Sequence, residues 1–401
     1  MRLLSNSRKT HSGQASCGAK PLSIRREVRA APFALGTLGL LALGLAAVIV
    51  PARAHHSMAA MYDDKKPVTV KGTVSAYEWT NPHVFITVEA SDGTWAVELP
   101  SRVELRRVGW TRDSVKAGDA VTVEASVARD GSKKAAAKSV TLASGKKLSA
   151  ITTEMVPVAK TQSKPAPHWP GGHVRLGVAP GERGYWANAS SPSLVETGAK
   201  VKFNSEGLLE NIADAGKVAP FQPWAKDLYE YRQRNFLKDD PMASCLPPGT
   251  PRQFQVPYGL QIVEQPDRQR IFVMSGGANR NWRVIYLDGR ALPTEDDGVS
   301  VYYGNSVGRW EGDTLIVTST GYNERFWFSN GGLPHTDHLK LTERISRPDF
   351  DTLKYEVAVD DPATYTRPWT SGWTLQWIPD QETEEYFCDD NNKDMERQAA
   401  K

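Results

Sequence analysis

Hydrophobic and polar residues alternate with a period of two along much of residues 67–142. Apolar positions recur in five short segments, punctuated by glycine, aspartate and proline, at 68–74, 84–88, 94–99, 121–125 and 138–142. Such alternation is typical of strands that bury one face. Five strands in so short a stretch, with one short helix expected over 101–108, predict a small β-barrel of the OB type.

A second series of short strands is predicted between Cys245 and the C-terminal region. Its segments lie at 260–264, 269–275, 282–287, 299–303, 309–310, 314–318, 339–345, 352–359, 373–377 and 384–388. The turn Glu311-Gly312-Asp313, flanked by β-branched and aromatic residues, is a strong hairpin signal. Consecutive hairpins without room for crossover helices predict an antiparallel, lipocalin-like barrel of about eight to ten strands, which can hold one small ligand.

The chain between the two series has a different composition. Residues 149–220 are rich in proline, glycine, serine and lysine, which predicts a linker, and its His168 and His173 are expected to be solvated. One helix is predicted over 223–237, because Pro223 suits a first turn and apolar residues follow at helical spacing. We therefore expect an all-β protein with one helix before the larger barrel. The chain is expected to divide into a signal (1–54), an OB-like domain (55–148), a linker (149–220), a barrel domain (221–392) and a tail (393–401).

The first 54 residues follow the order of a secretory signal. Basic residues that include Arg25 and Arg26 precede an apolar run over 30–50, and Ala52-Arg53-Ala54 closes the segment with small residues. The run has about the length of a membrane span, so an uncleaved anchor is the alternative. Because residues 23–26 resemble a twin-arginine signal, export to the periplasm by the Sec or the twin-arginine route is predicted, with no membrane attachment after cleavage.

Charge and cysteine content agree with export. The formal net charge is +3, but the first 54 residues hold eight basic residues and one acid, so the remainder has 41 basic and 45 acidic residues and gives no indication of a nucleic-acid partner. Cys17 lies in the leader, which leaves Cys245 and Cys388 as an even pair. In an oxidising compartment we expect them to form a disulfide; two buried free thiols are the alternative.

The new N-terminus would be rich in nitrogen ligands. If cleavage follows Ala54, His55 carries a free amine that can chelate a metal together with its imidazole, and His56 adds a second ring. His83, in Asn81-Pro82-His83, is the candidate third ring. Copper suits such a site, and a frayed terminus with solvated histidines is the alternative.

Two patterns in the larger domain suggest chemistry. His335, Asp337 and His338 lie close in sequence and could supply acid–base groups, although histidines in a loop are also often solvated. Residues 304–308 fit the pattern G-x-S-x-G of a nucleophile elbow. That elbow needs a helix after the serine, and strands are predicted on both sides, so we expect the two glycines to serve a bend instead.

Aromatic and charged residues of the same domain suggest a ligand site. Arg309, Trp310 and Glu311 surround the hairpin turn, and Arg367 could stack on Trp369 and clamp an aromatic or anionic ligand. Ordinary turn chemistry with a surface ion pair is the alternative. The high density of tryptophan predicts an apolar or aromatic ligand if some of these rings line the barrel.

Two parts of the chain resemble exported bacterial families. Residues 54–148, with AHHS, KPVTVKGTVSAYEWTNPHVFI and GWTRDSVKAGDAVTVEA, resemble a family of small exported domains of unknown function. Residues 220–392, with CLPPGTPR, YLDGR, GNSVGRWEGDTL, DDPATYTRPWT and EYFCDDN, resemble a largely uncharacterised exported family. The resemblance implies an independent domain in each part and supports the pairing of Cys245 with Cys388, but it implies no substrate.

Three functions follow as hypotheses. The first is binding of a small apolar or aromatic molecule in the larger barrel, in the periplasm, with neither nucleic acid nor membrane as partner. The second is a non-redox hydrolase, lyase or isomerase that uses His335, Asp337 and His338. The third is a copper-binding module built from His55, His56 and His83.

Overall fold

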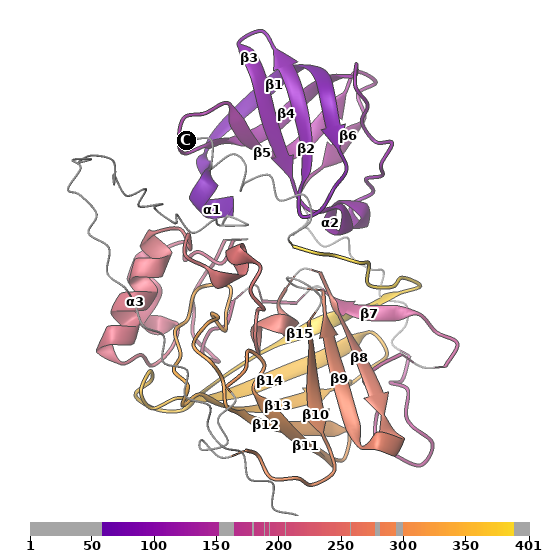
Figure 1. The fold of residues 1–401 in the computed structure, drawn as a ribbon, viewed down its shortest axis with the longest axis vertical. Helices are drawn as coiled ribbons and strands as arrows, with labels where there is room; N and C mark the ends of the chain where they lie inside the picture. The colour runs from indigo at the N-terminus through magenta and orange to yellow at the C-terminus, as the bar shows by residue number, and fades with distance from the viewer. Residues whose placement is uncertain are drawn as a thin grey trace, which may run out of the picture. The chain divides into compact units, whose positions relative to one another are not determined.

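The computed structural model describes residues 58–151 and 164–388, except 179, 188, 192, 205, 257, 277–280 and 294–299. Within these residues the chain is mostly strand and forms two β-barrels (Figure 1). The all-β prediction, with a small barrel before a larger one, is therefore confirmed. The predicted leader, its cleavage site and the tail 393–401 lie outside the described residues.

The smaller barrel is built from six strands, β1 (Tyr62–Glu78), β2 (Val84–Ala90), β3 (Gly93–Leu99), β4 (Ala120–Ala128), β5 (Lys134–Leu142) and β6 (Lys147–Ser149). They are ordered β3-β2-β1-β4-β5-β6, and a parallel pairing of β3 with β5 closes the sheet. A one-residue bulge after Val74 bends the long strand β1, so that it pairs with both β2 and β4. This order, with a helix between β3 and β4, matches the OB expectation.

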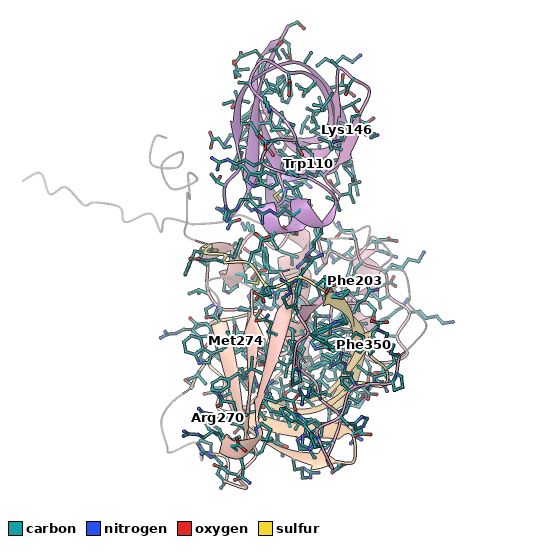
Figure 2. All side chains as sticks on the ribbon, turned by 90° about the vertical axis from the view of Figure 1, so that its right-hand side faces the viewer. Trp110, Lys146, Phe203, Arg270, Met274 and Phe350 are labelled. Atoms are coloured by element: carbon teal, nitrogen blue, oxygen red, sulfur yellow. A yellow bond between two sulfur atoms is a disulfide. The ribbon has the colours of Figure 1, made fainter. Side chains whose placement is uncertain are left out.

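Two short helices accompany this barrel, α1 (Met58–Met61) and α2 (Arg102–Arg107). A capping box starts α2, because the Ser101 side chain accepts from the Glu104 amide and the Glu104 carboxylate accepts from the Ser101 amide. Alternate residues of β2 enter the core, where Trp110 is buried and its Nε1 donates to the Ser149 carbonyl (Figure 2).

The larger barrel has nine strands, β7 (Gly184–Ala187), β8 (Leu260–Gln265), β9 (Arg270–Ser275), β10 (Asn281–Tyr286), β11 (Asn305–Glu311), β12 (Thr314–Thr320), β13 (Lys340–Ser346), β14 (Thr352–Asp360) and β15 (Trp369–Pro379). It is closed in the order β10-β11-β12-β13-β14-β15-β7-β8-β9. Neighbouring strands are antiparallel as predicted, with the exception of β10 and β11, which are parallel. The segment 384–388 is not a strand, and of 299–303 the described residues contribute an isolated bridge at Val301.

Helices are few outside the strands. The predicted helix is present as α3 (Pro223–Arg234), and short 3₁₀ helices are η1 (Ile212–Lys217), η2 (Pro241–Ser244), η3 (Arg252–Phe254) and η4 (Pro266–Arg268). The expected helix end at Leu237 comes earlier, because Phe236 and Leu237 adopt positive φ angles. Among the described residues, every helix is too short or too polar to span a bilayer.

Strand β7 corrects the expectation of a linker over 149–220. Its residues Gly184–Ala187 fill the position between β15 and β8 and so close the barrel. Trp186 holds the strand in place, because its ring is fully buried against Trp377 and its Nε1 donates to the Leu176 carbonyl. The Pro- and Gly-rich composition concealed this strand, since a four-residue segment gives little alternation to detect.

Aromatic side chains fill the interior of the larger barrel. Phe254, carried by η3, stacks on Tyr355 at 4.3 Å between ring centroids, and Trp373 lies 4.7 Å from the same tyrosine. Trp373 and Trp377 point inward from alternate positions of β15. Many of the tryptophans that predicted an aromatic lumen are therefore core residues packed against one another.

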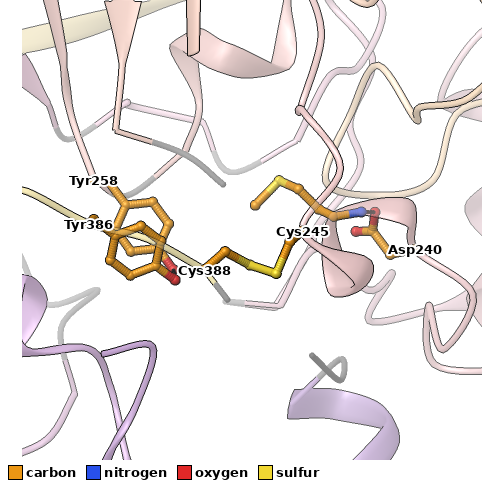
Figure 3. Close-up of a disulfide and its surroundings, with 6 residues drawn as sticks. Asp240, Cys245, Tyr258, Tyr386 and Cys388 are labelled. Carbon is orange, nitrogen blue, oxygen red and sulfur yellow. Dashed lines mark hydrogen bonds between the residues drawn. A yellow bond between two sulfur atoms is a disulfide. The ribbon is translucent and has the colours of Figure 1, made fainter. Parts of the chain in front are cut away.

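The predicted disulfide between Cys245 and Cys388 is present, with the two Cα atoms 5.6 Å apart (Figure 3). Both cysteines are buried beside Tyr386, whose ring stacks on Tyr258 at 4.4 Å. The Asp240 side chain accepts from the Met242 amide and so caps the start of η2, and Cys245 is the residue that follows the end of this helix. The C-terminal end of the described chain is thus covalently attached at the entry to strand β8.

Candidate ligand site at the seam of the larger barrel

The parallel seam between β10 and β11 shapes the surface of the larger barrel. The two strands share only the pairs Ile285–Ser306 and Tyr286–Val307. Parallel neighbours need a crossover that returns the chain to the same end of the sheet. Residues 287–304 make this connection, and their described parts, 287–293 and 300–304, contribute to the walls of a cavity at the seam.

This cavity has a volume of about 570 Å³, within the range of small-molecule sites. Its lining combines residues of β10, the crossover and β11, most of them aromatic or aliphatic, among them Trp282, Val284, Tyr286, Leu292, Tyr302 and Tyr303. Residues 301–307, which precede the predicted hairpin turn, form one wall of the cavity. The cavity therefore offers mainly ring faces and aliphatic surface to a ligand.

Alternation along β10 separates an inner and an outer face, and residues of both phases, Arg283 included, are among those that line the cavity. Arg283 and Ile285 are buried in the barrel interior, so Trp282, Val284 and Tyr286 lie on the opposite, outer face. Trp282 is 63% exposed, the largest exposed fraction among the large hydrophobic side chains of the described chain. An indole this exposed beside a cavity supplies apolar surface that a bound molecule would cover.

Two of the residues that line the cavity carry polar groups that are buried or already paired. The hydroxyl of Tyr303 is buried and has no hydrogen-bond partner within the described chain, and burial raises the pKa of this phenol. The guanidinium of Arg290 lies 3.6 Å from the centroid of the Tyr286 ring and is paired with Asp288 at 2.6 Å.

A buried ion pair lies on the inner side of the same strands. Arg283 Nη1 donates to Glu343 Oε1 at 2.9 Å, Nη2 donates to Oε2, and both side chains are fully buried. Arg283 also donates to Ser306 at 2.9 Å and to Ser319 at 2.6 Å, and the Tyr355 hydroxyl donates to Glu343 at 2.6 Å. Burial alone would lower the pKa of Arg283, but the Glu343 carboxylate outweighs it and raises that pKa.

This cluster explains the G-x-S-x-G pattern. Ser306 lies within strand β11 with its hydroxyl on Arg283, so it is not presented at a strand-to-helix turn. A Cβ at Gly308 would lie 2.9 Å from Ile285 across the seam. A Cβ at Gly304, where φ is +64°, would lie 2.6 Å from the Tyr322 ring. The two glycines allow Ile285 and the Tyr322 ring to pack closely against the backbone of this segment, so the G-x-S-x-G pattern is structural here.

The structure does not bring the predicted acid–base groups together. His335 is buried, with Nδ1 3.0 Å from the Thr336 carbonyl and Nε2 3.0 Å from the Phe326 carbonyl. Asp337 and His338 are exposed, and their closest charged atoms are 3.9 Å apart. Burial lowers the pKa of His335 in spite of its two carbonyl neighbours. Its ring nitrogens are thus occupied by backbone groups and do not point into a site shared with His338.

The residues predicted to bind a ligand around the hairpin turn lie elsewhere than the cavity. Arg309 and Glu311 form an exposed ion pair at 2.6 Å, as the turn alternative expected. Trp310 stacks on His173 at 3.7 Å between centroids. His173 is only partly exposed, and burial lowers its pKa, so it is not a fully solvated linker residue.

The second predicted clamp is also separate from the cavity. Arg367 pairs with Glu196 at 2.6 Å, and Trp369 is buried against Tyr365. Neither is among the described residues that line the cavity, and the same holds for Arg309, Trp310 and Glu311. The sequence signal that was missed is Trp282, a large aromatic residue in the outward phase of a predicted strand.

Of the predicted metal ligands, His55 and His56 lie outside the described residues. His83 is described and is held by Glu98 in the smaller barrel, with Nδ1 3.0 Å from Oε1. Among the residues that the structure describes, no group of three histidine, cysteine, aspartate or glutamate side chains is arranged to hold a metal ion. A complete site would therefore need ligands from outside that part of the chain.

Comparison with known proteins adds one match. Residues 42–137 match the model of a family described as being of unknown function, DUF6152. This range includes strands β1 to β4 of the smaller barrel and ends within β5. No curated protein and no solved structure matches the chain. The match indicates similarity in the smaller barrel and provides no function.

Proposed function

We propose that the protein binds a small, flat, apolar or aromatic molecule in the cavity at the β10–β11 seam. The observation that carries this proposal is the cavity of about 570 Å³ whose walls are mostly rings and aliphatic groups. The exposed Trp282 adds an apolar contact at its edge. Few polar groups in a mainly apolar pocket are typical of small-molecule sites.

The size of the cavity bounds the affinity. A ligand of about 15–20 non-hydrogen atoms, at about 0.3 kcal/mol per atom, gains roughly 5–6 kcal/mol. This free energy corresponds to a Kd of tens to hundreds of micromolar. The site therefore suits a ligand that exchanges rapidly.

The leader and the cysteines support a location outside the cytoplasm. Residues 1–54 have the order of a cleavable signal, and the bond between Cys245 and Cys388 suits an oxidising compartment. We propose the periplasm on these grounds, with export by the Sec or the twin-arginine route.

Binding is favoured over acid–base catalysis by the geometry of the histidines. A general acid or base must reach the substrate proton within hydrogen-bond distance. The ring nitrogens of His335 face backbone carbonyls instead, and His338 is exposed to solvent. The hydrolase, lyase or isomerase hypothesis therefore has no supporting arrangement among the described residues.

The test uses an uncharged aromatic fluorophore, N-phenyl-1-naphthylamine, which brightens in apolar sites. We expect saturable binding by the protein, weakened at least tenfold by Trp282→Ala. Trp224→Ala is the matched control, because Trp224 is also an exposed tryptophan but lies on α3, and it should leave the affinity unchanged. Absence of saturable binding, or equal affinity in Trp282→Ala and the unmodified protein, would refute the proposal.

A further inference from the structure

One end of the larger barrel is covered by a strap, residues 166–177. The connections β8–β9, β11–β12 and β13–β14 meet at this end, because the strands run antiparallel apart from the one parallel seam. Val174 and Leu176 of the strap are fully buried and belong to the same core cluster as Ile271 and Leu315. The strap therefore separates the apolar interior at this end from solvent.

The C-terminal half of the strap is attached by groups that keep their charge near neutral pH. Glu264, on β8, accepts from the amides of Leu176 and Gly177 at 2.7 and 3.0 Å. Arg347, directly after β13, donates to the carbonyls of Arg175 and Gly177 at 3.0 and 3.1 Å. These bonds hold residues 175–177 on two sides of the barrel opening.

The N-terminal half of the strap is attached through a histidine. Asp313, in the turn between β11 and β12, accepts from the Val174 amide at 2.9 Å, and His168 Nε2 lies 3.2 Å from the same carboxylate oxygen. His168 Nδ1 lies 3.0 Å from the Ala166 carbonyl. Both ring nitrogens thus face acceptors, and a neutral imidazole, which has one N–H, can donate to only one of them. The doubly protonated ring donates to both and adds an ion pair with Asp313.

The other groups around this contact leave His168 as the site of proton uptake. The hydrogen bond from His168 lowers the pKa of Asp313, so the carboxylate stays charged. His173 stacks on Trp310 at 3.7 Å between centroids, and its Nε2 lies 3.9 Å from Glu264. Burial lowers the pKa of His173, against the opposing effects of Glu264 and Asp313, so this ring favours its neutral form.

We propose that the strap responds to pH, with uptake of a second proton by His168 tightening its attachment to the β11–β12 turn. An imidazole changes its charge between pH 5 and 8. Because the charged ring makes a contact that the neutral ring lacks, attachment is tightest at the acidic side of this range and weakens as the pH rises. The proposal is independent of ligand binding at the seam between β10 and β11.

The experiment measures amide hydrogen exchange of the strap by mass spectrometry at pH 7.5 and 5.5. Protection is the ratio of the intrinsic to the measured exchange rate, so the direct effect of pH on the exchange chemistry cancels. We expect protection of the strap to rise about two- to fivefold at pH 5.5, the size typical of an exposed ion pair. His168→Gln should abolish this rise. His338→Gln is the matched control, because it replaces another exposed histidine of the same domain, and it should keep the rise.

A second variant changes the other side of the contact. Asp313→Asn removes the charge that pairs with His168 and weakens the acceptor of the Val174 amide, so protection of the strap should be lower at both pH values and should not rise. Strands β13 and β14 serve as an internal reference for a general effect of pH on the barrel. An equal rise in His168→Gln and the unmodified protein, an equal rise in the reference strands, or no rise in the unmodified protein would overturn the proposal.

Discussion

Removing the charge of Glu343 should strongly lower the free energy of unfolding of the larger barrel. Glu343→Gln keeps the shape of the side chain but leaves the buried Arg283 without its counter-ion. Loss of one partner of a fully buried pair costs about 3–5 kcal/mol, since the remaining charge stays out of water. Arg283 would retain only the hydroxyls of Ser306 and Ser319 and a neutral amide as acceptors.

The assay is unfolding in urea, followed by tryptophan fluorescence. At about 2 kcal/mol per M of urea, a loss of about 4 kcal/mol lowers the midpoint by roughly 2 M. Two barrels can give two transitions. Reduction of the bond between Cys245 and Cys388 identifies the unfolding transition of the larger barrel. Both cysteines lie in that part of the chain, so only this transition should shift.

The matched control replaces both partners together. Arg283→Met with Glu343→Leu removes the pair in favour of apolar groups of similar size, and should recover most of the stability lost by Glu343→Gln. A loss below 1 kcal/mol in the single variant, or a double variant no more stable than the single one, would refute the reasoning.

Two further predictions concern stability. Cys245→Ser with Cys388→Ser should lower the stability of the larger barrel by about 5 kcal/mol for a sequence separation of 143 residues; an unchanged urea midpoint would contradict this. Burial lowers the pKa of His335 from its ordinary 6.5. Below that pH the unfolded state therefore binds a proton at this histidine that the folded state does not bind. The free energy of unfolding should decrease as the pH falls from 7 to 5. His335→Gln should flatten this decrease in urea unfolding and His338→Gln should not; equal slopes would refute the assignment.

Local patterns predicted the architecture well. Alternation of apolar positions identified both barrels, and Pro223 with helical spacing identified α3. The pairing of Cys245 with Cys388 was predicted from the even count of cysteines that remains outside the predicted leader, and the structure contains this bond. These predictions were confirmed because each depends on residues close in sequence, or on a cysteine count that leaves a single possible pairing.

The candidate site could not be predicted in the same way. The partners Arg283 and Glu343 are on strands β10 and β13, and their contact depends on the order of strands around the barrel. The parallel seam that carries the cavity has only two residue pairs, whereas its sequence, 282–307, has the same alternation as a hairpin. The direction of a strand leaves little trace in its hydrophobic pattern, so the crossover between β10 and β11 appears only in three dimensions.

Strand β7 gives the barrel a place where it can open. The disulfide loop from Cys245 to Cys388 encloses β8 to β15, whereas β7 lies outside it and shares only the pair Trp186–Leu260 with β8. Detachment of these four residues would convert the closed barrel into an open sheet with two edge strands, β8 and β15, whose unpaired backbone groups are templates for other chains. The buried ring of Trp186 thus protects the protein against self-association as well as filling its core.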